Sequence, residues 1–178
     1  MAMQYDVSSI HLNQSGLGYV GRTRIKGLVI SCTSTGGTVN VWDSRSAPVA
    51  GTYIRSGTTV SVTSVGHGLS TGSRIGITFG AGATGGTATN GNYTVTITGA
   101  NTFDVTDINS GTITGPGACN FVSSSLTNPS PQWHASFDTG AAAGTTAVTI
   151  PGEGLIIETA LYLTMSATHI TSVTAFYG

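Results

Sequence analysis

The sequence predicts an all-β protein, organised as one discontinuous β-sandwich with a small β module inserted into it. Glycine, threonine, serine and valine dominate the composition, which disfavours helices and suits short strands joined by turns. Apolar and polar residues alternate in short runs along the chain, which is the period of two expected of strands. The longest helix-favouring stretch is only Ala141-Ala142-Ala143, enclosed by Gly140 and Gly144.

The central segment, residues 60–122, has the clearest strand pattern. Clusters of glycine, asparagine, serine and threonine separate its alternating runs, which cover 60–62, 74–79, 93–97 and 102–105. The dipeptide Asn90-Gly91 predicts a type I′ turn, because both central positions of that turn need a positive φ. Phe79, Tyr93 and Phe103 fall in strand patterns, so we expect them in a core. The segment is therefore predicted to form a small, self-closed β module.

Neither flank of this module is long enough to form a sandwich by itself. The flanks predict a turn at 13–18, a loop at 43–46, a proline-broken linker at 123–131, and strands at 3–12, 21–32, 38–42, 132–137, 146–150, 155–157, 160–165 and 172–177. The last two strands alternate cleanly and suit the closing hairpin of a sandwich. Together the flanks match the roughly 100 residues of a single sandwich. We therefore assign 1–55 plus 127–178 to the sandwich and 56–126 to the module, which a loop would carry.

The module resembles a known family. The stretches His67-Gly68-Leu69-Ser70, Asn90-Gly91-Asn92-Tyr93 and Ala100-Asn101-Thr102-Phe103 are similar in order and spacing to a small β-barrel-like module of tailed-phage virion proteins. That module is related in appearance to the first catalytic cysteine half-domain of ubiquitin-activating enzymes. The resemblance implies a structural or surface-display insert without catalysis. The candidate surface turns of this insert are His67, Gly68, Gly85, Asn90 and Gly91.

The flanks resemble a second family, the small phage virion proteins. The carrying motifs are RTRIKGLVIS near the start, TVNVWD, the turn IPGEGL and the apolar run LYLTM near the end. This resemblance implies a jelly-roll-like sandwich that binds the outer capsid as a decoration or cement protein, with the major capsid protein as partner. It also implies a homo-oligomer, with a trimer favoured, located in the virion. The alternative is a tail or fibre protein that recognises host glycans.

The charge content excludes several classes of partner. Only 7% of the residues are charged and the net charge is -1, so neither nucleic acid nor an anionic membrane is an expected partner. No apolar run approaches the ~20 residues that cross a bilayer, and the first residues lack the pattern of a signal peptide. A surface this neutral favours burial in an assembly, although a resistant secreted β protein has the same composition.

The residues that could carry catalysis are scattered. His67, His134 and Asp138 could join a serine in a triad, but no GxSxG motif is present, and we expect His67 to be a hydrogen-bonding turn residue. We expect Glu153 and Glu158 to lie near one turn, where they do not form a glycosidase pair. The glycine-rich loop 80–86 does not precede a helix, so it predicts an exposed, flexible loop and no phosphate site. We therefore expect a binding protein that is not an enzyme.

Metal and cofactor sites are not expected either. The four histidines, His11, His67, His134 and His169, lie far apart in the sequence. Cys32 and Cys119 show no CxxC spacing, and we expect two small buried side chains in preference to a disulfide. Asp104 and Asp107 could bind calcium weakly, but we expect them to be solvated turn carboxylates instead.

The remaining candidates are two arginines. Arg22 and Arg24 alternate along the predicted second strand and form the candidate interface for an acidic partner. We nevertheless expect both to be charges that solvate an edge strand, in preference to binding a partner.

Overall fold

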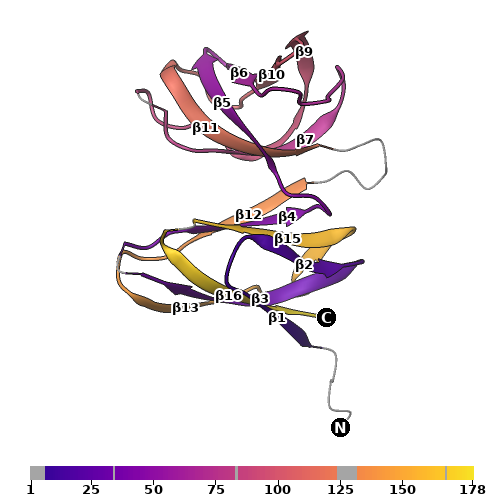
Figure 1. The fold of residues 1–178 in the computed structure, drawn as a ribbon, viewed down its shortest axis with the longest axis vertical. Coiled ribbons are helices and arrows are strands. Elements are labelled where there is room, and N and C mark those ends of the chain that lie inside the picture. The colour runs from indigo at the N-terminus through magenta and orange to yellow at the C-terminus, as the bar shows by residue number, and fades with distance from the viewer. Residues whose placement is uncertain (1–6, 34, 83, 124–131, 167) are drawn as a thin grey trace. The chain divides into compact units, whose positions relative to one another are not determined.

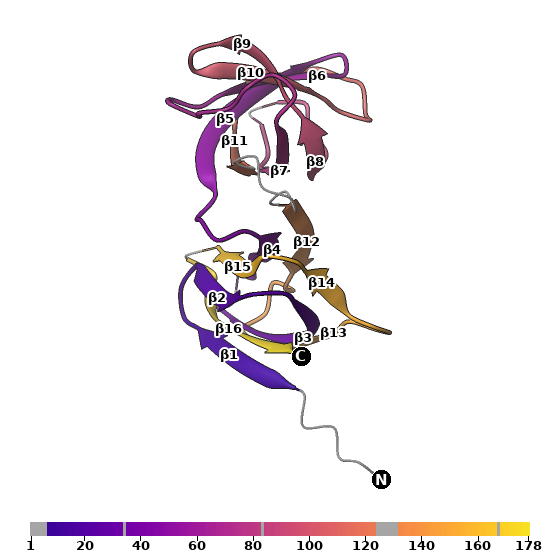
Figure 2. The same cartoon turned by 90° about the vertical axis from the view of Figure 1, so that its right-hand side faces the viewer.

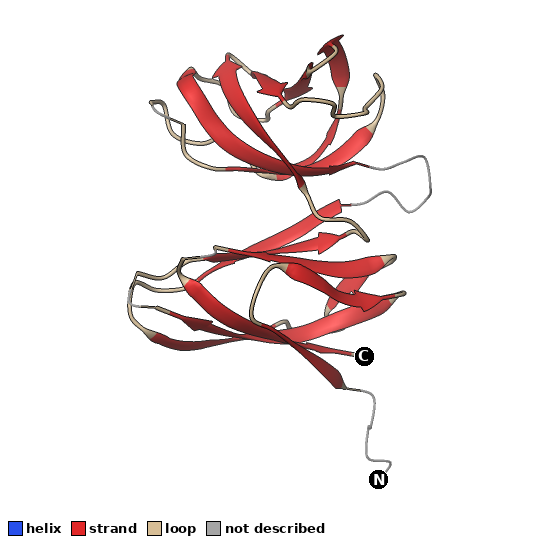
Figure 3. Cartoon of the chain, in the orientation of Figure 1, coloured by secondary structure: helices blue, strands red, loops and turns tan. Residues whose placement is uncertain are grey.

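A computed structural model describes residues 7–33, 35–82, 84–123, 132–166 and 168–178 of the chain. These residues form strands and loops only (Figure 3), so the predicted all-β class is confirmed. The chain divides into two compact units, one formed by Met1–Ala47 with His134–Gly178 and the other by Pro48–Trp133.

The first unit is a sandwich of two antiparallel sheets (Figure 1). One sheet has the order β1-β16-β3-β13, and β14 pairs with the first residues of β3 on the same side as β13. The other sheet has the order β12-β4-β15-β2. The strands of this unit are β1 (Ser8–Leu12), β2 (Gly16–Val20), β3 (Thr23–Cys32), β4 (Thr38–Asp43), β12 (Gln132–Asp138), β13 (Gly144–Thr149), β14 (Leu155–Ile157), β15 (Ala160–Met165) and β16 (Ile170–Tyr177).

The pairing of these strands is that of a jelly roll. The first strand pairs with the last, β1 with β16, and the pairs nest inward through β2 with β15 and β3 with β13 and β14 to β4 with β12. The unit is thus one long antiparallel hairpin wrapped into two sheets. The tip of that hairpin lies between β4 and β12, and the second unit is inserted there in the sequence.

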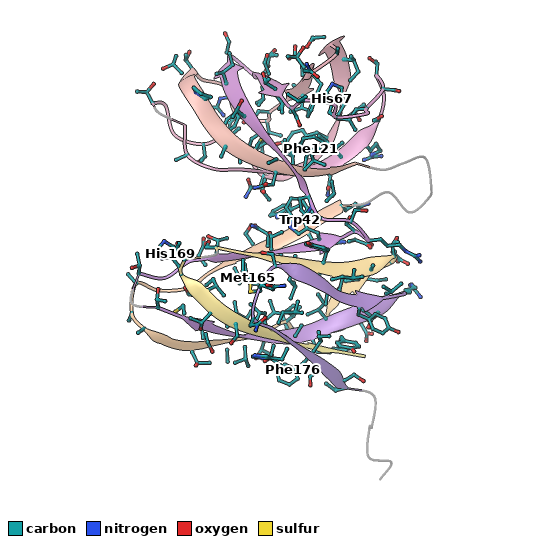
Figure 4. The ribbon with its side chains drawn as sticks, viewed as in Figure 1. Trp42, His67, Phe121, Met165, His169 and Phe176 are labelled. Atoms are coloured by element: carbon teal, nitrogen blue, oxygen red, sulfur yellow. The ribbon has the colours of Figure 1, made fainter. Side chains whose placement is uncertain are left out.

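The sandwich core explains why these residues form strands. Alternate residues of each strand point between the sheets, and the predicted face of Leu161, Leu163 and Met165 is buried with Val39 and Val41. Figure 4 shows Met165 inside the sandwich and Phe176 on the outer face of its sheet. Burial of these apolar side chains, at about 25 cal/mol per Å² of apolar surface, is the main force that holds the two sheets together.

Two predictions about the flanks are wrong. The closing hairpin is absent, because β15 and β16 lie in opposite sheets and pair with β4 and β3, respectively. The turn predicted at 13–18 is too long, because the bend covers only 13–15 and residues 16–18 already belong to β2. The side chain of Leu161 packs 3.2 Å from the position that a Cβ of Gly18 would take, so glycine is used here for close packing.

The second unit is a single curled sheet with the order β8-β7-β11-β5-β6-β10-β9 (Figure 2). Its strands are β5 (Val49–Ser56), β6 (Thr59–Thr63), β7 (Arg74–Phe79), β8 (Gly91–Thr94), β9 (Thr96–Gly99), β10 (Thr102–Thr106) and β11 (Ile113–Ser123). The two end strands of the sheet, β8 and β9, are separated in the sequence by Val95 alone. The sheet must therefore curl round on itself, and it forms a nearly closed barrel.

The interior of this curled sheet is aromatic. Phe103 and Phe121 meet edge to face with ring centroids 5.3 Å apart, and Tyr53 meets Phe79 in the same manner at 4.6 Å. Phe79 and Phe103 are buried and Tyr93 packs against the same cluster, as predicted. Figure 4 labels Phe121 inside the sheet.

The boundary between the units differs from the predicted one. The prediction placed 48–55 in the sandwich, but β5 pairs with β6 and β11 of the module sheet. Gln132 and Trp133 are the first two residues of β12, but they belong to the compact unit of the module. The C-terminal boundary of the module therefore lies at 133 and not at 126. The predicted linker at 123–131 lies, apart from the backbone of Ser123, outside the described residues.

Candidate functional site

Arg22 and Arg24 lie beside a shallow pocket on the outer face of the sandwich. The pocket has a volume of about 220 Å³ and is lined by Arg22, Thr23, Arg24, Ile156 and Gly178. Arg24 pairs with Ile156 of β14 on one side, and on the other it exchanges two backbone hydrogen bonds with Gly178, of 3.2 and 3.1 Å. Three neighbouring segments thus place an arginine, an isoleucine and a glycine in one outward-facing row.

Arg24 lies on β3, which is not the edge strand that the sequence predicts. β3 lies between β16 on one side and β13 and β14 on the other, so its backbone groups are paired in both directions. The arginines therefore do not protect a free edge. Arg24 projects from a central strand of the sheet, and Arg22 lies in the bend just before that strand.

The side chain of each arginine donates one hydrogen bond to a described residue. Arg22 Nε donates to Glu158 Oε2 at 2.8 Å, and this ion pair is exposed. Arg24 Nη1 donates to the carbonyl oxygen of Glu153 at 3.4 Å, and Lys26 Nζ donates to the same oxygen at 3.0 Å. Arg24 and Lys26 thus hold the turn that precedes β14, and each guanidinium keeps further N–H groups for a ligand.

His67 is a turn residue, but its side chain is buried. Its Nδ1 accepts the backbone N–H of Leu69 at 3.1 Å, and its ring meets Phe103 edge to face at 5.4 Å. Only 9% of the residue is exposed, as the interior position in Figure 4 indicates. The neighbouring Gly68 is exposed with a φ of 65°. The predicted hydrogen-bonding role is therefore present, whereas the histidine ring is not a surface feature.

Asn90 and Gly91 do not form the predicted type I′ turn. Gly91 begins β8 without a positive φ, and Asn90 Oδ1 instead accepts the N–H of Phe79 at 2.7 Å. The connection from β7 to β8 is an eleven-residue loop, 80–90, and not a two-residue turn. The amide of Asn90 closes the base of that loop, which is a side-chain role of asparagine that a turn dipeptide does not reveal.

The glycine-rich loop 80–86 is hydrogen-bonded to its surroundings. Thr84 and Thr114 exchange backbone hydrogen bonds of 3.2 Å, and Gly82 donates to Gly86 at 2.9 Å. The hydroxyl of Tyr53 donates to Gly80 O at 2.7 Å and accepts the N–H of Ala88 at 3.2 Å. The described residues of this loop are mostly exposed, Gly85 among them, as predicted, and these hydrogen bonds join the loop to β11 and to Tyr53 of β5.

Asp107 is buried inside the module, which contradicts the solvated alternative. It accepts Arg55 Nη1 at 2.7 Å, and the backbone N–H groups of Thr89 and Asn109 each at 3.1 Å. Burial by itself would raise the pKa of Asp107, but hydrogen bonds from Thr89, Asn109 and Arg55 outweigh it and lower the pKa to about 2. Asp107 and Arg55 therefore join the loop before β8, the loop after β10 and strand β5.

Asp43 is a second buried carboxylate, and the sequence did not single it out. Its two oxygens accept the backbone N–H groups of Glu158, Thr159 and Ala160, at 2.7, 2.9 and 3.0 Å. Burial raises the pKa of Asp43, while the neighbouring His134 ring and the three N–H donors lower it, and the net pKa lies below its usual value. His134 Nε2 is 4.0 Å away, too far for a hydrogen bond, so the backbone donors are the contacts that hold the carboxylate.

The structure does not assemble the catalytic or metal candidates. His134 faces Asp43, and Asp138 accepts a hydrogen bond from Thr38, while His67 belongs to the other unit. Among the described residues, no three histidine, cysteine, aspartate or glutamate side chains gather as metal ligands. Cys32 and Cys119 are buried free thiols in different units, as predicted.

Comparisons with protein-family models, with curated proteins and with solved structures find no significant match for this chain. Within the described ranges, no helix has the length and apolarity needed to cross a membrane.

Proposed function

We propose that this chain is a structural virion protein of a tailed bacteriophage that binds the outer capsid as a decoration protein. The observation that carries the proposal is the architecture: a jelly roll wrapped from one hairpin, with a second closed β unit inserted at the hairpin tip. Such a chain separates a part that can bind the shell from a part that can face solvent. The proposal joins this architecture to the phage-like motifs in both units.

The proposed mechanism is association without chemistry. The buried carboxylates Asp43 and Asp107 are each held by at least three donors and so act in the fold itself. A bound decoration protein stabilises a shell because it favours the assembled state over the free subunits. A closed homo-oligomer, with a trimer favoured, would present several copies of the binding surface to the major capsid protein.

A tail or fibre protein that recognises host glycans is the second candidate. Val65 and Ile108 favour it, because these two loop side chains of the module are 83% and 82% exposed. Exposed apolar side chains at loop tips suit contact with a receptor. Single exposed apolar residues are also common on protein surfaces, so this observation ranks below the architecture.

The test is reconstitution on shells. Purified chain is added to capsids that lack it, and binding is measured by co-sedimentation together with the temperature at which the shells open. The decoration role predicts saturable binding at a fixed ratio to the major capsid protein and a higher opening temperature. Binding to host cells or their glycans without binding to capsids would transfer the assignment to the second candidate.

A further inference from the structure

We infer that the pocket of Arg22 and Arg24 binds the carboxylate of an acidic side chain presented by a partner protein. Three of the six lysines and arginines of the chain lie at positions 22, 24 and 26, although only 7% of its residues are charged. Glu158 neutralises Arg22 in part, while Glu153 meets Arg24 and Lys26 through its backbone carbonyl. The pocket therefore keeps a positive charge that an anion would complement.

The geometry suits a carboxylate in particular. Nε of Arg22 is occupied by Glu158 and Nη1 of Arg24 by Glu153, so further N–H groups of two neighbouring guanidinium groups border one hollow. Arginine donors bind carboxylates through paired, charge-assisted hydrogen bonds.

The size and surroundings favour a protein as the source of this carboxylate. A volume of about 220 Å³ is below the 300–1,000 Å³ of typical small-molecule sites and matches one or two side chains. Ile156 supplies an apolar wall, and none of the described residues that line the pocket is an aromatic that could stack on a sugar ring. Further along the same outer face, beyond Lys26, Phe176 lies opposite Gly27 and Thr174 lies opposite Val29. Arginine beside apolar surface is typical of the residues that dominate protein–protein binding.

The proposed function contributes only one element to this inference, namely that the partner is a protein. The test therefore uses the purified full-length chain and synthetic ligands without any virus particle. A negative result here leaves the particle experiments untouched, and a protein absent from particles could still bind an acidic peptide.

The probe is a short glutamate-rich peptide, compared with the same peptide carrying glutamine and with a uronic acid oligosaccharide. Binding is followed by NMR shifts of the Arg22, Arg24 and Ile156 signals. We expect the glutamate peptide to bind saturably and the glutamine peptide to show no comparable binding. The double variant that carries both Arg22→Gln and Arg24→Gln should bind the glutamate peptide at least about tenfold more weakly.

Lys26→Gln is the matched control. Lys26 carries the same charge and donates to the same Glu153 carbonyl as Arg24, but it does not line the pocket. We expect Lys26→Gln to weaken binding by less than about threefold, as expected of general charge loss. Equal losses for Lys26→Gln and Arg24→Gln, or no saturable peptide binding to the unmodified chain, would overturn the inference. Binding of the oligosaccharide but not of the peptide would overturn the protein partner.

Discussion

Arg55 and Asp107 form an ion pair of 2.7 Å inside the module, with side-chain exposures of 8% and 0%. Arg22 and Glu158 form an ion pair of nearly the same length, 2.8 Å, on the surface of the sandwich, with exposures of 66% and 38%. The two pairs share chemistry and distance and differ in burial. Variants of the two pairs therefore show how burial changes the contribution of an ion pair to stability when its length is nearly the same.

Removing Asp107 should destabilise the module severely. Asp107→Ala leaves the Arg55 guanidinium buried without its partner, and we expect a loss of about 3–5 kcal/mol in the free energy of unfolding. Glu158→Ala breaks the exposed pair and should cost less than about 1 kcal/mol. Chemical denaturation followed by circular dichroism measures both, and equal losses for the two variants would contradict the structural role of Asp107.

The same carboxylate should make stability depend on pH. The pKa of Asp107 is lowered from 3.8 to about 2 in the folded protein, so its stabilising effect is complete above the unfolded pKa and is lost as the pH falls through the folded one. We expect unfolding free energy to decrease between about pH 4 and pH 2, with a smaller decrease in Asp107→Asn. Asp43, whose pKa is also lowered, should account for part of the remaining slope. An unchanged slope in Asp107→Asn would contradict this attribution.

Asp43 should be the residue on which the corner before β15 depends. In Asp43→Ala the N–H groups of Glu158, Thr159 and Ala160 lose their acceptor; the contact to Ala160 is buried and the other two are part-buried. An unpaired buried donor costs about 1–3 kcal/mol, so we expect a loss of at least about 2 kcal/mol. The control is Asp138→Ala, which removes one exposed hydrogen bond with Thr38 and should change stability by less than about 1 kcal/mol. Thermal unfolding of both variants measures the two losses, and equal losses would contradict the role of Asp43.

Gly85 and Gly68 should respond differently to the same substitution. Both have a positive φ, of 90° and 65°, so alanine costs roughly 1–2 kcal/mol of backbone strain at either position. At Gly85 a Cβ would also lie 2.0 Å from the carbonyl oxygen of Thr112, whereas at Gly68 it meets open space. We expect Gly85→Ala to be the more destabilising by at least about 1 kcal/mol. Equal unfolding midpoints for the two variants would show that the loop can move away from Thr112.

The buried thiol of Cys119 should be unreactive in the folded protein. Burial raises its pKa to about 12, so almost no thiolate is present at pH 8. We expect a thiol reagent to modify Cys119 only after denaturation, when both cysteines should react. Fast labelling of Cys119 under native conditions, detected by mass spectrometry, would contradict its burial.

The sequence predicts strands well where one side of a strand is buried and the other is not. The alternation of Leu161, Leu163 and Met165 marks such a strand, and the structure confirms its bounds. It does not predict which strand pairs with which, because alternation is a local property and sheet partners are chosen across the whole chain. For this reason β15 and β16, neighbours in sequence, were expected to form a hairpin but lie in different sheets.

The candidate sites show the same limit. Arg22 and Arg24 could be selected from their rarity in a weakly charged chain, whereas the pocket beside them depends on Ile156 and Gly178, which are more than 130 residues away in the sequence. Asp107 could have been recognised as buried, because Arg55 shares its strand face with the core residue Tyr53 and needs an acid. Asp43 carries no such signal, since its donors are backbone groups.

The most direct test of the proposed function is the copy number of this chain, relative to the major capsid protein, in purified particles of the phage that the proposal expects to encode it. Quantitative mass spectrometry of the particles gives that ratio. The decoration role predicts parity with the major capsid protein or a simple fraction of it. A handful of copies would contradict decoration and place the chain in the tail, and complete absence from particles would contradict the virion assignment itself.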